Sequence, residues 1–100
     1  MATDNARKKP LESIKVIVYG RVQGVGFRNF TLTIAQRYGI VGWVRNNYNG
    51  TVEIWAESTK DTLLHFLAEV RRGPRSGYVS KTDIEWYTPK GNFKTFNIRT

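Results

Sequence analysis

Residues 20–28 read Gly-Arg-Val-Gln-Gly-Val-Gly-Phe-Arg, and this segment guides the interpretation of the whole chain. It follows residues 14–19, a mostly apolar run rich in β-branched side chains, which predicts a buried strand. It precedes apolar side chains at helical spacing between residues 28 and 38. The segment is therefore predicted to turn from a strand into a helix, with Gly24 and Gly26 in the turn and Arg28 at the helix start.

This combination of residues is suited to holding a phosphate group. Glycines let successive backbone N–H groups converge on one point, and a helix N-terminus adds unpaired N–H donors. An arginine adds a charged fork that matches two phosphate oxygens. The glycine spacing fits neither the dinucleotide fingerprint nor the Walker loop, and the pattern alone is also typical of an ordinary turn with a solvated arginine. The candidate phosphate-binding residues are Gln23, Gly24, Val25, Gly26, Phe27 and Arg28.

The remaining elements follow from periodicity and turn signals. After the helix at about 28–38, the Asn49-Gly50 pair predicts a hairpin between strands 41–47 and 51–57. Ser58 or Thr59 can cap a second helix that runs to Arg72, and strands near 78–87 and 94–99 complete the chain. In strand 51–57 the alternation predicts one buried face and one solvent-exposed face, with Glu53, Trp55 and Glu57 on the exposed face.

This order predicts an α+β fold, the ferredoxin-like β-α-β-β-α-β sandwich. With right-handed crossovers it forms a four-stranded antiparallel sheet with two helices on one face. A chain of 100 residues forms one domain, here residues 13–100, preceded by a disordered polar tail at residues 1–12. The net charge of +8 favours anionic partners, and the lack of cysteine excludes disulfides and thiolate chemistry.

A second segment carries an unusual polar residue at the end of a core strand. Asn46 closes Gly42-Trp43-Val44-Arg45-Asn46, and asparagine is depleted in strands. It either opens the turn by bonding its own backbone or faces the first loop across the sheet.

Together, the two segments resemble the signatures of the acylphosphatase family. The first is matched by Val18-x-Gly20-x-Val22-Gln23-Gly24-Val25-x-Phe27-Arg28. The second is matched by Gly42-Trp43-Val44-Arg45-Asn46-x-x-x-Gly50-x-Val52, although Ser58 stands where its closing glycine is usual. The resemblance spans about residues 14–99.

The resemblance implies hydrolysis of the carboxyl–phosphate bond of acyl phosphates to a carboxylate and inorganic phosphate. It implies that Arg28 and the backbone N–H groups of residues 23–28 bind the phosphoryl group, and that Asn46 orients the attacking water. His65, the only histidine, lies on the polar side of its predicted helix and is expected to be solvated. The substrate's own phosphate remains as the proton acceptor, and no cofactor or metal is expected, since no metal-ligand spacing occurs.

We expect a cytoplasmic monomer that acts on a small-molecule acyl phosphate, with no membrane and no specific nucleic acid as partner. The alternatives left open are phosphate binding without turnover, and single-stranded RNA binding by a basic ferredoxin-like module, since the chain has three tryptophans and five tyrosines. A portion of a larger carbamoyl-transferring maturation protein is a further alternative.

Overall fold

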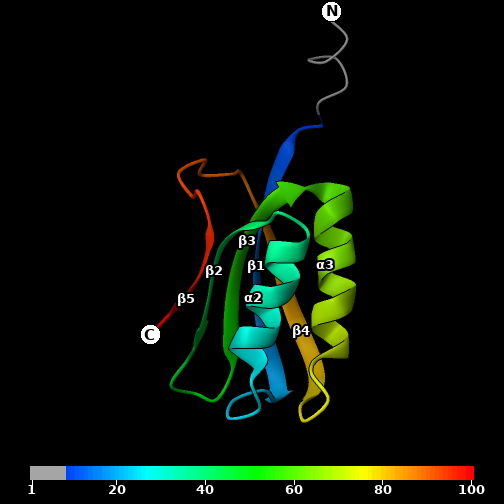
Figure 1. The fold of residues 1–100 in the computed structure, drawn as a ribbon, viewed down its shortest axis with the longest axis vertical. Coiled ribbons are helices and arrows are strands. Elements are labelled where there is room, and N and C mark those ends of the chain that lie inside the picture. The colour runs from blue at the N-terminus through cyan, green and yellow to red at the C-terminus, as the bar shows by residue number, and fades with distance from the viewer. Residues whose placement is uncertain (1–8) are drawn as a thin grey trace, which may run out of the picture.

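The computed structural model describes residues 9–100, which form two helices packed on one sheet (Figure 1). The elements in chain order are β1 (Leu11–Arg21), α2 (Phe27–Arg37), β2 (Val41–Asn46), β3 (Val52–Thr59), α3 (Lys60–Arg72), β4 (Tyr78–Tyr87) and β5 (Phe96–Arg99). Because β1 begins at Leu11, the predicted tail of residues 1–12 is two residues too long at its end; residues 1–8 of that tail lie outside the described residues. No helix within 9–100 has the length and apolarity needed to cross a membrane.

The sheet corrects the predicted fold in one respect. It has five strands in the order β4-β1-β3-β2-β5, and not four. β1 pairs antiparallel with β3 and β4, and β2 pairs antiparallel with β3, as the ferredoxin-like order requires. β5 instead pairs parallel with β2, from Gly42 opposite Phe96 to Arg45 opposite Arg99, so the sheet is mixed. The chain after β4 crosses to the far edge of the sheet, where β2 still has a free edge to pair.

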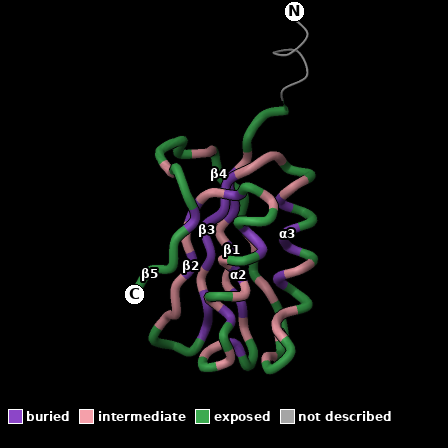
Figure 2. Tube along the Cα trace, in the orientation of Figure 1, coloured by how far each residue is buried: buried purple, intermediate pink, exposed green. Residues whose placement is uncertain are grey.

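The core lies between the sheet and the two helices, as predicted (Figure 2). Each core strand turns alternate side chains toward the helices, and Ile14, Val16 and Ile54 are fully buried there. α3 contributes one apolar stripe, in which Leu63, Phe66, Leu67 and Val70 are all buried.

The predicted helix and hairpin signals are confirmed at α3 and between β2 and β3. Thr59 caps α3, and its hydroxyl accepts a hydrogen bond from the backbone N–H of Thr62. Asn47 to Gly50 form the turn, in which the Gly50 N–H donates to the Asn47 carbonyl at 3.2 Å. The hairpin and the loop before α2 lie at the same end of the molecule (Figure 1).

The prediction of a wet outer face on β3 is wrong. Trp55 is 8% exposed and Glu57 is 3% exposed. The Trp55 ring stacks on Tyr87, with ring centroids 5.1 Å apart. The Glu57 carboxylate accepts hydrogen bonds from Ser13 Oγ at 2.6 Å, Trp55 Nε1 at 3.2 Å and the backbone N–H groups of Lys90 and Gly91 at 2.9 and 3.3 Å. The connection from β4 to β5 therefore covers this face and is held there by the hydrogen bonds of Lys90 and Gly91 to Glu57.

Candidate active site

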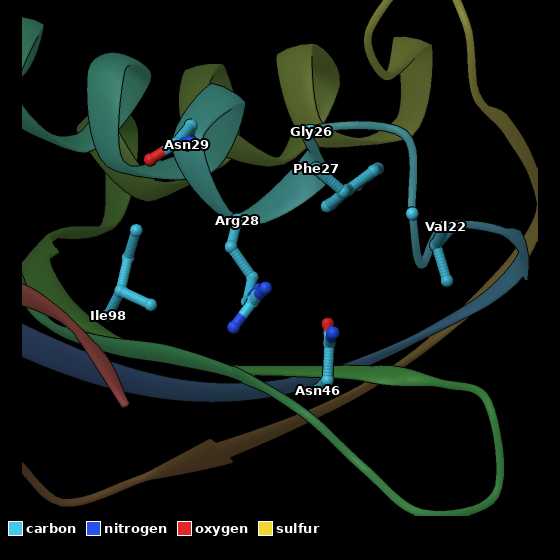
Figure 3. Close-up of a pocket in the computed structure, with 8 residues that line it drawn as sticks. Val22, Gly26, Phe27, Arg28, Asn29, Asn46 and Ile98 are labelled. Carbon is cyan, nitrogen blue, oxygen red and sulfur yellow. The ribbon is translucent and has the colours of Figure 1, made fainter. Parts of the chain in front are cut away.

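A cavity of about 280 Å³ opens between the start of α2 and the ends of β2 and β5. Its lining comes from the first loop, the first turn of α2 and these two strands: Val22, Gly24, Gly26, Phe27, Arg28, Asn29, Asn46 and Ile98. Arg28 and Asn46 point toward one another across it, and Ile98 stands to one side (Figure 3). The structure thus places the two residues singled out from separate motifs in one pocket.

The two glycines of the loop give it a shape that exposes backbone donors. Gly24 has φ +75° and Gly26 has φ +79°, a conformation that residues with a Cβ rarely adopt. Gly26 is the N-cap of α2 and its carbonyl accepts the first helical hydrogen bond, from Phe30 N–H at 3.0 Å. Within residues 9–100, the backbone N–H groups of residues 23–29 have no hydrogen-bond acceptor in the protein. Of these residues, Gly24, Gly26, Phe27, Arg28 and Asn29 line the cavity, so a ligand there lies beside a set of unpaired donors.

The charge at this helix end is positive and uncompensated. The first turn of α2 contains no acidic residue, so no side chain of this turn offsets the partial positive charge of the helix N-terminus. Arg28 takes part in none of the five ion pairs formed within the described part of the chain. An anion with several oxygens is the ligand that such a site attracts most strongly.

Asn46 reaches the cavity because of its position on β2. Val44 is fully buried under the helices, and Asn46 is two residues further along the strand, so it faces the same side. Its Oδ1 atom is buried and has no hydrogen-bond partner in residues 9–100. A buried carbonyl oxygen without a partner is costly, unless a water or ligand donates to it.

Not every predicted phosphate-binding residue lines the cavity. Gly24, Gly26, Phe27 and Arg28 do, and the Phe27 ring is buried in the core beside Phe30. Gln23 and Val25 do not: the Gln23 side chain binds the β2–β3 hairpin instead, and Val25 packs against the core.

Three lining residues were not predicted from the sequence: Val22, Asn29 and Ile98. Val22 and Asn29 adjoin the predicted segment and could have been found by extending it. Ile98 could not, because it depends on the position of β5.

The only histidine of the chain, a candidate for acid–base catalysis, does not line the cavity. His65 is exposed on α3 and stacks on Tyr38, with ring centroids 6.4 Å apart. Residues 9–100 bring together no group of three or more His, Cys, Asp or Glu side chains that could hold a metal ion.

Comparison with known proteins agrees with this geometry. The family model "Acylphosphatase" matches residues 14–98. The chain belongs to the acylphosphatase family.

Three individual comparisons extend over most of the chain. An acylphosphatase of Salinibacter ruber is 43% identical over 82 residues, which cover 82% of this chain and 86% of that protein. The crystal structure of an acylphosphatase from Bacillus subtilis superposes with a TM-score of 0.86 at 34% identity, covering 89% of this chain and 99% of that one. A third match, to full-length HypF in a phosphate- and nucleotide-bound form, has a TM-score of 0.86 at 28% identity and covers 94% of this chain and 12% of that one. The acylphosphatase fold and the expected resemblance are thus confirmed.

Proposed function

We propose that this acylphosphatase hydrolyses the carboxyl–phosphate bond of acyl phosphates without a metal ion, through Arg28, the loop of residues 23–28 and Asn46. Membership of the family makes the chain an enzyme that acts on acyl phosphates. The observation that carries the assignment of residues is the shared pocket, where Arg28 and Asn46 face one another (Figure 3).

In this proposal the phosphoryl group lies at the N-terminus of α2. Unpaired backbone N–H groups of the loop and the first turn of α2 donate to its oxygens, and the Arg28 guanidinium donates two parallel hydrogen bonds. Charge spread over the three equatorial oxygens in the transition state is stabilised by these fixed donors. Because the donors are in place before the substrate arrives, little reorganisation is needed during the reaction.

Asn46 orients the water that attacks phosphorus. Its unpartnered Oδ1 accepts a hydrogen bond from the water, while its NH₂ group donates to the water or to a phosphoryl oxygen. The water oxygen forms a bond to phosphorus as the bond from phosphorus to the acyl oxygen breaks in line with it, so the electron pair leaves with the carboxylate. The acyl group then points away from Asn46.

The proton of the water passes to the substrate's own phosphate. Asparagine does not accept a proton, and His65 is held on α3 against Tyr38. A carboxylate is a stable leaving group, so the reaction does not need a protein acid to protonate it. The products are the free carboxylate and protonated inorganic phosphate.

The open face of the sheet favours this function over single-stranded RNA binding. Base stacking needs accessible aromatic faces. Trp55 is 8% exposed, and the guanidinium carbons of Arg45 and Arg99 lie 5.2 and 4.7 Å from the centre of the Trp43 ring. These observations argue against base stacking on Trp43 and Trp55.

We further propose that the enzyme works as a cytoplasmic monomer. A chain without cysteine needs no oxidising compartment to fold, and all the residues assigned to the reaction come from one chain. The molar mass measured by light scattering in solution tests the oligomeric state.

The test of the reaction compares benzoyl phosphate with phenyl phosphate, which differ in having a carboxylate or a phenolate as leaving group. We expect release of inorganic phosphate from benzoyl phosphate, unchanged by EDTA, and little or none from phenyl phosphate. Comparable rates on both substrates, or complete loss of benzoyl phosphate turnover in EDTA, would contradict the proposal.

A further inference from the structure

The side chain of Gln23 joins the phosphate loop to the hairpin that follows Asn46. Gln23 Nε2 donates to the carbonyl oxygen of Asn47 at 2.7 Å and to that of Thr51 at 2.9 Å. Both partners are acceptors only, so the NH₂ end of the amide must face them and both of its N–H groups are used. The side chain is therefore committed to the hairpin and does not reach the cavity.

The carbonyl groups of Asn47 and Thr51 lie just beyond the end of the β2–β3 ladder, next to the candidate active site. Asn46 pairs with Val52 at the end of the β2–β3 ladder, and Asn47 and Thr51 are the next residues outward. There the Asn47 N–H donates to the Thr51 carbonyl at 2.9 Å, which closes the turn. Gln23 thus binds the residue directly after Asn46 and the residue directly before its partner.

The phosphate loop has other anchors that do not involve Gln23. Phe27 is 1% exposed in the core. Val25 lies against the turn between α3 and β4, so close that a Cβ at Gly77 would come within 3.1 Å of its Cγ2. The loop keeps these contacts when the Gln23 amide is removed, whereas its direct link to the hairpin is lost.

We infer that Gln23 is a positioning residue, which holds Asn46 at the correct distance from the phosphoryl group bound by the loop. The inference rests on the proposed function, because it needs Asn46 to orient the attacking water. Small displacements of an orienting group lower the rate strongly, by up to about 100-fold for about 1 Å. Phosphate affinity depends on the loop and Arg28, so it is preserved when this link is lost.

The experiment replaces Gln23 by methionine, which keeps the length of the side chain and removes both donors. Gln36, exposed on α2, gives the matched control Gln36→Met. For benzoyl phosphate we expect Gln23→Met to lower kcat about 10- to 100-fold. We expect the inhibition constant of inorganic phosphate to change less than about threefold, because the loop donors remain, and Gln36→Met to match the parent in both. An unchanged kcat, or phosphate affinity lost in proportion to kcat, overturns the inference.

A double-variant cycle identifies the route by which Gln23 acts. In an Asn46→Ala background, Gln23→Met should lower the remaining kcat by less than about twofold, since the group that it positions is gone. A full additional loss shows that Gln23 acts by another route and overturns the inference. Near-normal turnover of Asn46→Ala alone refutes the proposed function instead, so the two failures are distinguishable.

A second variant keeps the inference testable if Gln23→Met does not fold. At neutral pH, Gln23→Glu places a carboxylate beside the carbonyl oxygens of Asn47 and Thr51, which repel it. Protonation of this carboxylate restores one of the two hydrogen-bond donors. The introduced carboxyl group has its pKa raised by these acceptors and by partial burial. The kcat of Gln23→Glu relative to the parent should therefore rise as pH falls from about 7 to about 5. A ratio that stays flat over this range contradicts the inference.

Discussion

Glu57 is predicted to stabilise the fold by joining β1 and β3 to the connection between β4 and β5. The substitution Glu57→Gln tests this with little change in the shape of the side chain. The carboxylate is 3% exposed and accepts four hydrogen bonds. Three of the donors converge on Oε2, from Ser13, Trp55 and Lys90, and one, from Gly91, reaches Oε1. An amide can turn its oxygen toward the first three donors, but its NH₂ group then faces the Gly91 N–H.

The magnitude follows from these contacts. A hydrogen bond to a charged acceptor contributes about 1.5–3 kcal/mol, against about 0.5–1.5 kcal/mol for a neutral one. Three bonds are weakened in this way, and the Gly91 N–H is left facing another donor. Relief from the desolvation of a buried carboxylate offsets part of this loss. We expect Glu57→Gln to lower the free energy of unfolding by about 3 kcal/mol at pH 7.

The effect should depend on pH with a defined sign. Burial alone raises the pKa of Glu57, but the hydrogen bonds from Ser13, Lys90, Trp55 and Gly91 outweigh it and hold the pKa below its ordinary value of 4.5. A carboxyl group with a lowered folded-state pKa stabilises the fold above its unfolded pKa, and this stabilisation is lost as pH falls through the folded-state pKa. The difference between parent and variant should therefore be constant near neutrality and shrink below about pH 4.5.

The assay is urea unfolding followed by tryptophan fluorescence at pH 7 and at steps down to pH 3. The matched control is Glu85→Gln, since Glu85 is exposed and pairs with Lys15 at 3.4 Å; it should change stability by less than about 1 kcal/mol. A difference below about 0.5 kcal/mol for Glu57→Gln at pH 7 would refute this role, as would a difference that stays the same down to pH 3.

Three further outcomes are expected. Arg28→Lys keeps the charge and loses the two-pronged geometry, so kcat for benzoyl phosphate should fall about 10²- to 10³-fold; a loss below about fivefold would contradict it. Asn46→Ala should lose turnover to a similar extent while inorganic phosphate, titrated by calorimetry, still binds within about threefold of the parent. Gly42→Ala should lower the free energy of unfolding, measured in urea, by more than about 2 kcal/mol, because φ is +140° and a Cβ would lie 1.9 Å from the Trp55 carbonyl oxygen. Gly39→Ala, with φ +67° and open space around it, should cost only about 1–2 kcal/mol, and equal losses would refute the steric argument.

The sequence was most informative where local chemistry determines structure. The pair Asn49-Gly50 predicted the hairpin, and Thr59 predicted the start of α3, because turn and cap geometries depend on a few neighbouring residues. The order of elements left open whether Asn46 opens the turn or faces the first loop, and only the family resemblance joined it to Arg28 in one site. In the structure both residues line the same pocket.

The sequence was least informative where the partner of an element is distant. Nothing in residues 94–99 says whether they return beside β4 or cross the sheet to β2. Along the crossing, the backbone N–H groups of Lys90 and Gly91 donate hydrogen bonds to Glu57, which lies 33 and 34 residues earlier in the chain. The alternation in β3 predicted that Glu57 is exposed to solvent. Such a local pattern carries no information about the β4–β5 connection, which covers Glu57 in the structure. Because the position of β5 could not be predicted, Ile98 was not among the candidate site residues.

The groups that line the candidate active site have a consequence for how the enzyme responds to acidity. A guanidinium, backbone N–H groups and a carboxamide donate hydrogen bonds but take no proton from the attacking water. The pH profile of the rate should therefore report the ionisation of the substrate's phosphate. Acid acts on the protein at the opposite end of the sheet, through the carboxylate that secures the last crossing. Loss of activity on acidification would then separate into two events, a change in the charge of the substrate and a loss of stability of the fold.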